Sequence, residues 1–125
     1  MEIGIHTFGE IVPDPHTQQK ISAHQRLKQV IQIAILADEA GLDLFGFGEH
    51  HRLDIAASAS PVVLAAVAQA TKHIRLTSTA TVLSTADPVR VFEEFATLDL
   101  LSDGRAELIV KENSTFSSCT STNGA

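Results

Sequence analysis

The sequence predicts an α/β domain built on a parallel sheet, and three observations carry this prediction. Short β-rich runs begin near residues 3, 42, 74 and 105, and longer segments with apolar residues at helical spacing lie between them. The units are each roughly 30 to 40 residues long, which suits a strand with its crossover helix. The predicted order is β-α-β-α-β-α-β, which is typical of parallel strands joined by right-handed crossovers.

The first unit has clear boundaries. A strand is expected from Ile3 to Phe8. A helix should open at Ser22, because Gln25 follows three residues later and completes a Ser-x-x-Gln capping box. Gly41 then stands where a helix takes a glycine just past its last turn.

The later units repeat this logic. We expect strands at residues 42–48, 74–83 and 105–110. Ser60-Pro61 and Asp87-Pro88 each offer a capping residue followed by a proline, whose missing N–H costs nothing at the first helical position. Gly104 should end the last helix.

Composition limits the class of protein. The chain has 125 residues, 44% of them apolar and 19% charged, and a net charge of −6. The acidic balance argues against a nucleic-acid partner or an anionic membrane surface. The longest apolar run, Val62 to Ala68, is far shorter than the ~20 residues of a membrane helix. The first residues lack the basic region of a signal peptide, so we expect a cytoplasmic protein whose single cysteine, Cys119, is a free thiol.

The stretch FGFGEHH, residues 45–51, is the candidate functional site. Side chains alternate along a strand, so the two Phe residues and Glu49 would face the helices, while Gly46, Gly48 and His50 face the concave side of the sheet. The glycines would then leave an empty shelf for a flat ligand. His50 would stand at the carboxyl end of the strand, where sheets and barrels of this class place active sites.

Other interpretations of these residues stay open on composition alone. Both histidines could be loop residues hydrogen-bonded to carbonyls. A metal site is disfavoured, because Glu49, His50 and His51 are adjacent and would diverge on an extended strand. A nucleophile is disfavoured as well, because Cys119 lies in a polar tail and no Gly-x-Ser-x-Gly elbow is present.

Two architectures fit the alternation of elements: an open doubly wound sheet, or part of a (β/α)₈ barrel. Gly46-Phe47-Gly48 lacks the third glycine and the following helix of a dinucleotide-binding fingerprint.

Two stretches resemble bacterial luciferase and the luciferase-like flavin-dependent monooxygenases. One is Glu49-His50-His51; the other is TATVLSTADPVRVFEEFATLDLLSDGR, residues 79–105. The second matches the family's pattern Pro-Val-Arg, then Glu, then Leu-Asp-x-Leu-Ser-x-Gly-Arg, in order and spacing. The first ten residues also fit the family's first strand, so the resemblance covers residues 1 to about 110.

The resemblance implies the N-terminal half of a TIM barrel, with four parallel strands and three helices. It implies an enzyme that uses reduced FMN and O₂ to oxidise an aldehyde or a similar small organic substrate, with a flavin reductase as a possible partner. It makes His50 the catalytic acid/base and implies a non-proline cis peptide at Thr79-Ala80. The cofactor-binding residues implied by the same resemblance are Gly46, Gly48, Glu49, His51, Thr79 and Ala80.

The sequence also departs from the family. The turn whose arginine helps to hold the flavin phosphate reads Lys111-Glu112-Asn113 here, and strands five to eight do not follow. We therefore expect a truncated member with a half-barrel at residues 1–110 and a polar, poorly packed tail at 111–125, including Phe116 and Cys119.

Three functions compete at this point. The first is the FMN-dependent monooxygenase. The second is a non-catalytic half-barrel, an assembly or interaction module that has lost flavin binding, and the third replaces FMN with a deazaflavin. An open half-barrel would leave two strand edges unpaired and its concave face uncovered. Apolar residues expected on that face, such as Leu44, Leu76, Ala80 and Val82, would be exposed, so a homo-oligomer is expected.

Overall fold

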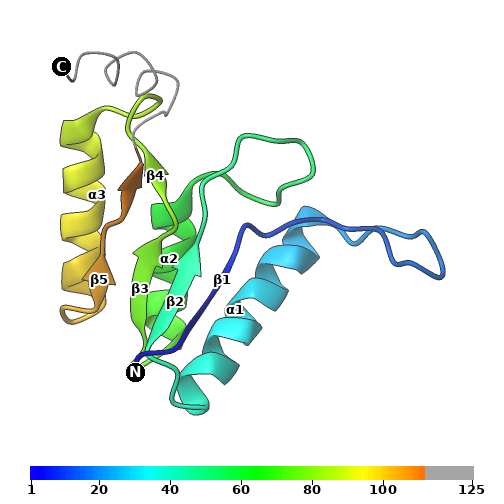
Figure 1. Ribbon diagram of the computed structural model, residues 1–125, viewed down its shortest axis with the longest axis horizontal. Coiled ribbons are helices and arrows are strands. Elements are labelled where there is room, and N and C mark those ends of the chain that lie inside the picture. The colour runs from blue at the N-terminus through cyan, green and yellow to red at the C-terminus, as the bar shows by residue number, and fades with distance from the viewer. Residues whose placement is uncertain (112–125) are drawn as a thin grey trace, which may run out of the picture.

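A parallel sheet with three helices makes up the computed structural model, which describes residues 1–111 (Figure 1). The main sheet has the order β1-β2-β3-β5 and consists of β1 (Gly4–Thr7), β2 (Leu44–Phe47), β3 (Arg75–Ser78) and β5 (Ala106–Glu107). All three strand pairs are parallel, so the predicted alternation of strands and helices is confirmed.

The helices are α1 (Ala23–Glu39), α2 (Ser60–Ala70) and α3 (Pro88–Leu101). Helix α1 begins with the expected capping box, since the Ser22 hydroxyl accepts from Gln25 N and the Gln25 side chain accepts from Ser22 N. Asp87 caps α3 with a single side-chain bond, by accepting from Val89 N at 2.8 Å.

Helix α2 begins differently from the prediction. Its N-cap is Ala59, which makes no side-chain cap bond, and Ser60 is already helical. Ser60 is buried, and its hydroxyl has no hydrogen-bond partner within residues 1–111. The expectation that Ser60 caps this helix is therefore wrong, and the proline at residue 61 remains as the helix-start signal.

The third and fourth expected strands are each broken in two, so the single strands predicted at 74–83 and 105–110 are wrong. The Thr79-Ala80 peptide bond is cis, as the family resemblance implied, and it separates β3 from β4 (Thr81–Val82). Residues 108 and 109 separate β5 from β6 (Val110–Lys111). Beyond the breaks β4 and β6 pair with each other in parallel as a separate two-stranded ladder.

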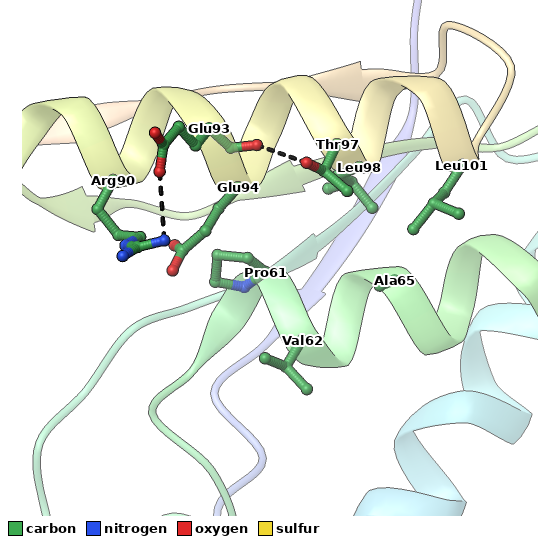
Figure 2. A pocket seen from close by; sticks show the side chains of 9 residues that line it. All are labelled: Pro61, Val62, Ala65, Arg90, Glu93, Glu94, Thr97, Leu98 and Leu101. Carbon is green, nitrogen blue, oxygen red and sulfur yellow. Dashed lines mark hydrogen bonds and ion pairs between the residues drawn. The ribbon is translucent and has the colours of Figure 1, made fainter.

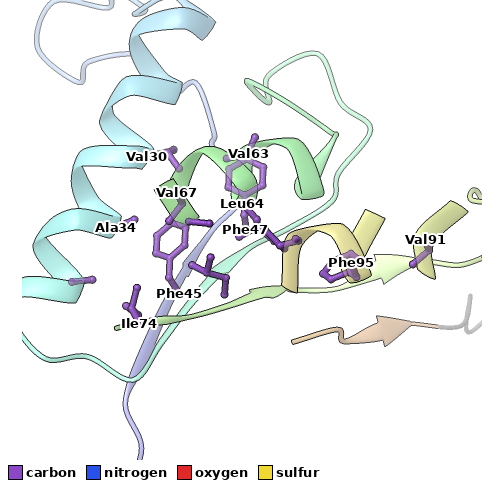
Figure 3. Close-up of a cluster of buried hydrophobic side chains, with 14 residues drawn as sticks. Val30, Ala34, Phe45, Phe47, Val63, Leu64, Val67, Ile74, Val91 and Phe95 are labelled. Atoms are coloured by element: carbon purple, nitrogen blue, oxygen red, sulfur yellow. The ribbon is translucent and has the colours of Figure 1, made fainter. Parts of the chain in front are cut away.

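The core lies between the helices and one face of the sheet (Figure 3). Phe45 and Phe47 of β2 are both 0% exposed, as the alternation of Phe and Gly predicted. They pack with apolar residues from all three helices, from β3 and from the residue just before β3: Val30, Ala34, Val63, Leu64, Val67, Ile74, Leu76, Val91, Phe95 and Leu98.

The concave face of the sheet is more polar than expected. The register pairs Leu44 with Arg75 and Gly46 with Thr77, so Arg75 and Thr77 share the face of Gly46. Leu76 lies on the helix side and is 0% exposed, which corrects its expected place on the concave face. Arg75 instead forms ion pairs there, 2.8 Å from Glu2 and 2.7 Å from Glu107.

Lys111 ends β6 and so belongs to the folded part of the chain, not to the expected tail. The rest of that tail, with Phe116 and Cys119, lies outside the described residues. Among residues 1–111, no helix combines the length and the apolar character that crossing a membrane requires.

Candidate functional site

A hollow of about 450 Å³ lies at the carboxyl ends of β1, β2 and β3, the edge at which parallel α/β folds bind ligands. Its volume is within the range of small-molecule sites, about 300 to 1,000 Å³. The residues that line it are Phe8, Glu49, His50, His51, Thr79, Ala80, Val82 and Lys111. The structure thus brings together five of the seven residues proposed from sequence, and the other two, Gly46 and Gly48, lie beneath it.

His50 stands just beyond β2, on the side of the strand that carries Gly48. Its ring makes an edge-to-face contact with Phe8, with ring centroids 5.6 Å apart and an interplanar angle of 83°. Its main-chain carbonyl accepts from the Ser58 hydroxyl at 2.9 Å, which ties the loop after β2 to the start of α2. The imidazole of His50 therefore faces the hollow and is exposed enough to meet a ligand.

Strand alternation predicts that His50, and not His51, faces the concave side, yet His51 lines the same hollow. The reason is Glu49, whose side chain is only 12% exposed. Glu49 Oε1 lies 2.6 Å from His51 Nε2, and Glu49 Oε2 accepts from Val82 N at 3.1 Å. Glu49 Oε1 also accepts from the Thr85 hydroxyl at 3.2 Å, so this carboxylate joins the end of β2 to the segment after the cis peptide.

The expected empty shelf above the glycines is absent, because the protein's own side chains occupy that space. A Cβ on Gly46 would lie 2.6 Å from Thr79 Cγ2. A Cβ on Gly48 would lie 2.2 Å from the Phe8 ring. The two glycines are required for this close approach of Thr79 and Phe8, and neither lines the hollow.

Thr79 presents an unsatisfied polar atom at this place. Its Oγ1 is buried and has no hydrogen-bond partner in the described part of the chain. Buried hydroxyls are nearly always paired, and the exceptions ask for an explanation such as a missing ligand or water. Thr79 and Ala80, joined by the cis bond, both line the hollow.

Sequence reasoning missed Phe8, Val82 and Lys111. Phe8 lies two residues after His6, so strand alternation places it on the concave face at the carboxyl end of β1, and this signal was available. Lys111 reaches the hollow only because β6 pairs with β4, and that pairing depends on the two strand breaks. Within residues 1–111, no cluster of three or more His, Cys, Asp or Glu side chains could hold a metal ion.

A second hollow, about 460 Å³, lies between α2 and α3, away from the strand ends (Figure 2). It is lined by Pro61, Val62, Ala65, Arg90, Glu93, Glu94, Thr97, Leu98 and Leu101. Its polar end holds the Arg90–Glu93 ion pair at 3.2 Å, and its apolar end has no titratable group. The first hollow is the candidate functional site, because both histidines line it.

Comparison with known proteins bears on the family and the fold of this chain. Residues 1–112 match the family model described as luciferase-like monooxygenase. The oxygenase component of the flavin-dependent trigonelline monooxygenase from Acinetobacter baylyi is 28% identical over 86% of this chain and 29% of its own length. Among solved structures, apo-MsnO8 has a TM-score of 0.81 and 27% identity, with 92% of this chain and 33% of that one covered.

The oxygenating constituent of 3,6-diketocamphane monooxygenase from Pseudomonas putida, solved with FMN, has a TM-score of 0.77 and 25% identity. The match covers 89% of this chain and 29% of that one. The fold is therefore α/β, the N-terminal half of a TIM barrel with four parallel strands and three helices. The chain belongs to the luciferase-like monooxygenase family. It spans about a third or less of the length of these relatives.

Proposed function

We propose that this chain carries the flavin-facing and acid/base part of an FMN-dependent monooxygenase that oxidises an aldehyde or a similar small organic substrate with O₂. The observation that carries the proposal is the hollow at the strand ends, which His50, Thr79 and Ala80 line together. Family membership supports the flavin, and the FMN bound to one structural neighbour supports FMN in particular.

The residues at the hollow fit a flat, partly polar group such as the flavin ring. Phe8 and the backbone of Thr79-Ala80 offer surfaces for stacking, and the unpaired Thr79 hydroxyl offers a hydrogen bond. The ammonium of Lys111 offers a positive charge for an anionic group. Gly46 and Gly48 serve indirectly, because they admit Thr79 and Phe8.

When bound, the flavin supplies the redox chemistry that activates oxygen. The chain's own residues bind, orient and move protons. His50 presents its imidazole to the hollow, where it can act as a general acid or base toward a bound substrate. Glu49 holds His51 at 2.6 Å and anchors Val82 N, so both walls of the hollow keep their positions.

The partner of such an enzyme is a flavin reductase, and the name "oxygenase component" of the Acinetobacter relative supports this assignment. We infer a cytoplasmic location, where reduced flavin is available. The net charge of −6 supports neither nucleic acid nor an anionic membrane as a partner, because both are negatively charged.

We also propose that two copies associate through α2 and α3. The second hollow is bordered by exposed apolar residues, with Val62 70% exposed and Leu101 48% exposed, and Phe92 is 72% exposed on the same helix α3. Arg90 and Glu94 lie at one end, so a two-fold axis would bring opposite charges together. Sedimentation of the 125-residue chain at micromolar concentration should give a dimer, and Val62→Asp should give a monomer. A wild-type monomer would contradict the dimer alone.

The cofactor is tested by titrating the 125-residue chain with reduced FMN under anaerobic conditions and measuring the heat of binding by calorimetry. Thr79→Val replaces the orphaned hydroxyl with a methyl group and should weaken binding by up to about tenfold. Thr97→Val on α3 is the matched control, because its hydroxyl bonds to Glu93 O away from the site. Failure of the wild-type chain to bind reduced FMN would overturn the proposal and favour the non-catalytic half-barrel. Binding of a deazaflavin, but not of FMN, would favour a deazaflavin-dependent enzyme.

Catalysis is tested with His50→Asn, in the presence of reduced FMN, O₂ and an aliphatic aldehyde such as decanal. The variant should bind reduced FMN like the wild type and lose about 10²- to 10⁴-fold in turnover, the usual contribution of a general acid or base. Full turnover in this variant would remove His50 from the catalytic role.

A further inference from the structure

Phe8 occupies a place that links the first two strands to His50. Its ring lies over Gly48, where an added Cβ would come within 2.2 Å of both Cδ1 and Cε1. One neighbour of the ring is His6, with centroids 5.6 Å apart and an interplanar angle of 89°. The other is His50, at 5.6 Å and 83°. The Phe8 ring thus lies between the imidazoles of His6 and His50 and packs closely on Gly48.

The two histidines after β2 are held by different means. His51 is fixed by the 2.6 Å contact between its Nε2 and Glu49. Among residues 1–111 no hydrogen bond to the imidazole of His50 is present, although its main-chain carbonyl is bonded to Ser58. Its ring is exposed and would turn freely about two torsions unless a neighbour restricts it. The neighbour in place is Phe8.

The geometry points to Phe8 as a positioning residue, which sets the orientation of the His50 imidazole toward the hollow. This inference rests on the proposed acid/base role of His50 for its functional meaning, but the orientation itself is independent of that role. Edge-to-face contact between aromatic rings has preferred geometry, so Phe8 limits the rotamers that His50 adopts. Proton transfer requires such placement, because a general acid or base must reach the reacting group within hydrogen-bond distance.

Gly48 sets the position of Phe8 in turn. Strands β1 and β2 are paired in register from Gly4–Leu44 to Thr7–Phe47, and Gly48 N donates to Thr7 O at 2.9 Å. The backbones at Phe8 and Gly48 are therefore fixed relative to each other. A side chain at residue 48 would push the Phe8 ring away, and His50 would lose its contact.

The orientation of His50 is measured by NMR of the histidine side chains in the 125-residue chain, without flavin or substrate. The signals to be read are the Hα–Hβ couplings of His50, which report its side-chain rotamer and do not change merely because a neighbouring ring current is lost; in the wild type they should indicate one preferred rotamer. Phe8→Leu keeps apolar volume and removes the aromatic ring, so these signals should move to the averaged values of a freely turning histidine. Gly48→Ala should cause the same change, although residue 8 is intact.

Three controls keep the outcome clear. The signals of His51 should stay in place in both variants, because Glu49 holds that ring. Phe92→Leu removes an exposed ring from α3, 72% exposed, and should leave His50 unchanged. Phe8→Tyr keeps the ring and should restore the wild-type signals, which a purely volume-filling role would not require. A dispersed amide spectrum identifies variants that remain folded, and Phe8→Tyr supplies the test if Phe8→Leu unfolds.

Unchanged His50 signals in a folded Phe8→Leu chain would overturn the inference. So would His50 signals in folded Phe8→Tyr that match free histidine. The proposed function fails by different results: no binding of reduced FMN would overturn the cofactor, and an active His50→Asn variant would overturn the catalytic role of His50. Neither result changes the His50 signals of the wild type.

Discussion

Arg105 donates to both oxygens of Thr71, through Nη1 to the side-chain hydroxyl at 3.0 Å and through Nη2 to the main-chain carbonyl at 3.2 Å. The same guanidinium reaches Ala68 O at 2.8 Å and Ile74 O at 2.9 Å, and its Nε bonds to Ser102 O at 2.8 Å. Arg105 therefore binds the carbonyls at the end of α2, the start of β3 and the end of α3 together.

Arg105→Lys should lower the free energy of unfolding by about 2 to 3 kcal/mol, because one ammonium cannot serve carbonyls that the planar guanidinium reaches together. Urea unfolding followed by far-ultraviolet circular dichroism measures the change. The matched control is Arg52→Lys in the loop after β2, where the side chain is 60% exposed and its pair with Asp54 contributes little. Equal stabilities of the two variants would show that the Arg105 bonds do not matter.

Asp38 should make the stability of the chain depend on pH in the acid range. Desolvation alone would raise the pKa of this carboxylate, but backbone N–H groups of Lys72, Ile74 and His73 donate to it and leave its pKa below the ordinary value of 3.8. A lowered folded pKa means that this stabilisation is present above the unfolded pKa and is lost as the pH falls through the folded value. We therefore expect stability to decrease below about pH 4.

Asp38→Asn should remove that part of the acid dependence and cost about 1 to 2 kcal/mol at neutral pH. Glu39→Gln, the next residue along α1, changes the same charge on an exposed side chain and should do neither. The measurement is urea unfolding at a series of pH values between 3 and 7. Parallel stability curves for wild type and Asp38→Asn would contradict the prediction.

Glu49→Ala should expose the amide of Val82 to exchange. Val82 N donates to Glu49 Oε2 at 3.1 Å, and a hydrogen bond to a charged group contributes about 1.5 to 3 kcal/mol, which corresponds to tenfold or more in exchange rate. Hydrogen exchange by NMR reports this amide directly. The control is Glu94→Ala, a change at an exposed residue of α3, which should leave the exchange rate of this amide unchanged. An unchanged rate in Glu49→Ala would contradict the prediction and would mean that another acceptor replaces the carboxylate.

Gly46→Ala should destabilise the fold by about 1 to 3 kcal/mol, the usual cost of overpacking. The new Cβ would lie 2.6 Å from Thr79 Cγ2 and 3.0 Å from His6 Cβ. Thr79→Ser removes Cγ2, so the double variant Gly46→Ala/Thr79→Ser should recover part of the loss. Thermal unfolding of all four chains gives the coupling; strictly additive effects would show that the two residues do not meet.

Much of the fold follows from local signals in the sequence. Two helix starts are marked by capping residues and their neighbours, Ser22 with Gln25 and Asp87 with Pro88. These signals lie within a few residues of each helix start, so they can be predicted without knowing how the elements pack. The burial of Phe45 and Phe47 follows from alternation within one strand. Thr79-Ala80 as a cis bond came from family resemblance, since the β-rich run from residue 74 to 83 carries no local signal of a break.

The missed features depend on pairing between strands. Residues 44 and 75 are partners, so odd-numbered residues of β3 share a face with even-numbered residues of β2. Leu76 was placed on the wrong face for this reason, since a register shift of one residue reverses every side chain. The filled space above Gly46 and Gly48 was also missed because it depends on contacts between strands. Thr79 and Phe8, which fill it, follow two other strands of the sheet.

The stretch from Leu98 to Arg105 has a consequence for how the family can diverge. Ser102 N bonds to Leu98 O at 2.9 Å, Gly104 adopts a φ of 80°, and Arg105 reaches three segments. Leu98, Ser102, Gly104 and Arg105 therefore serve the scaffold. Selection can preserve these residues in any descendant that still has to fold, whatever reaction it performs. Residues around Arg105 therefore indicate only that the scaffold is kept, whereas a shared reaction would have to be judged from the residues around His50.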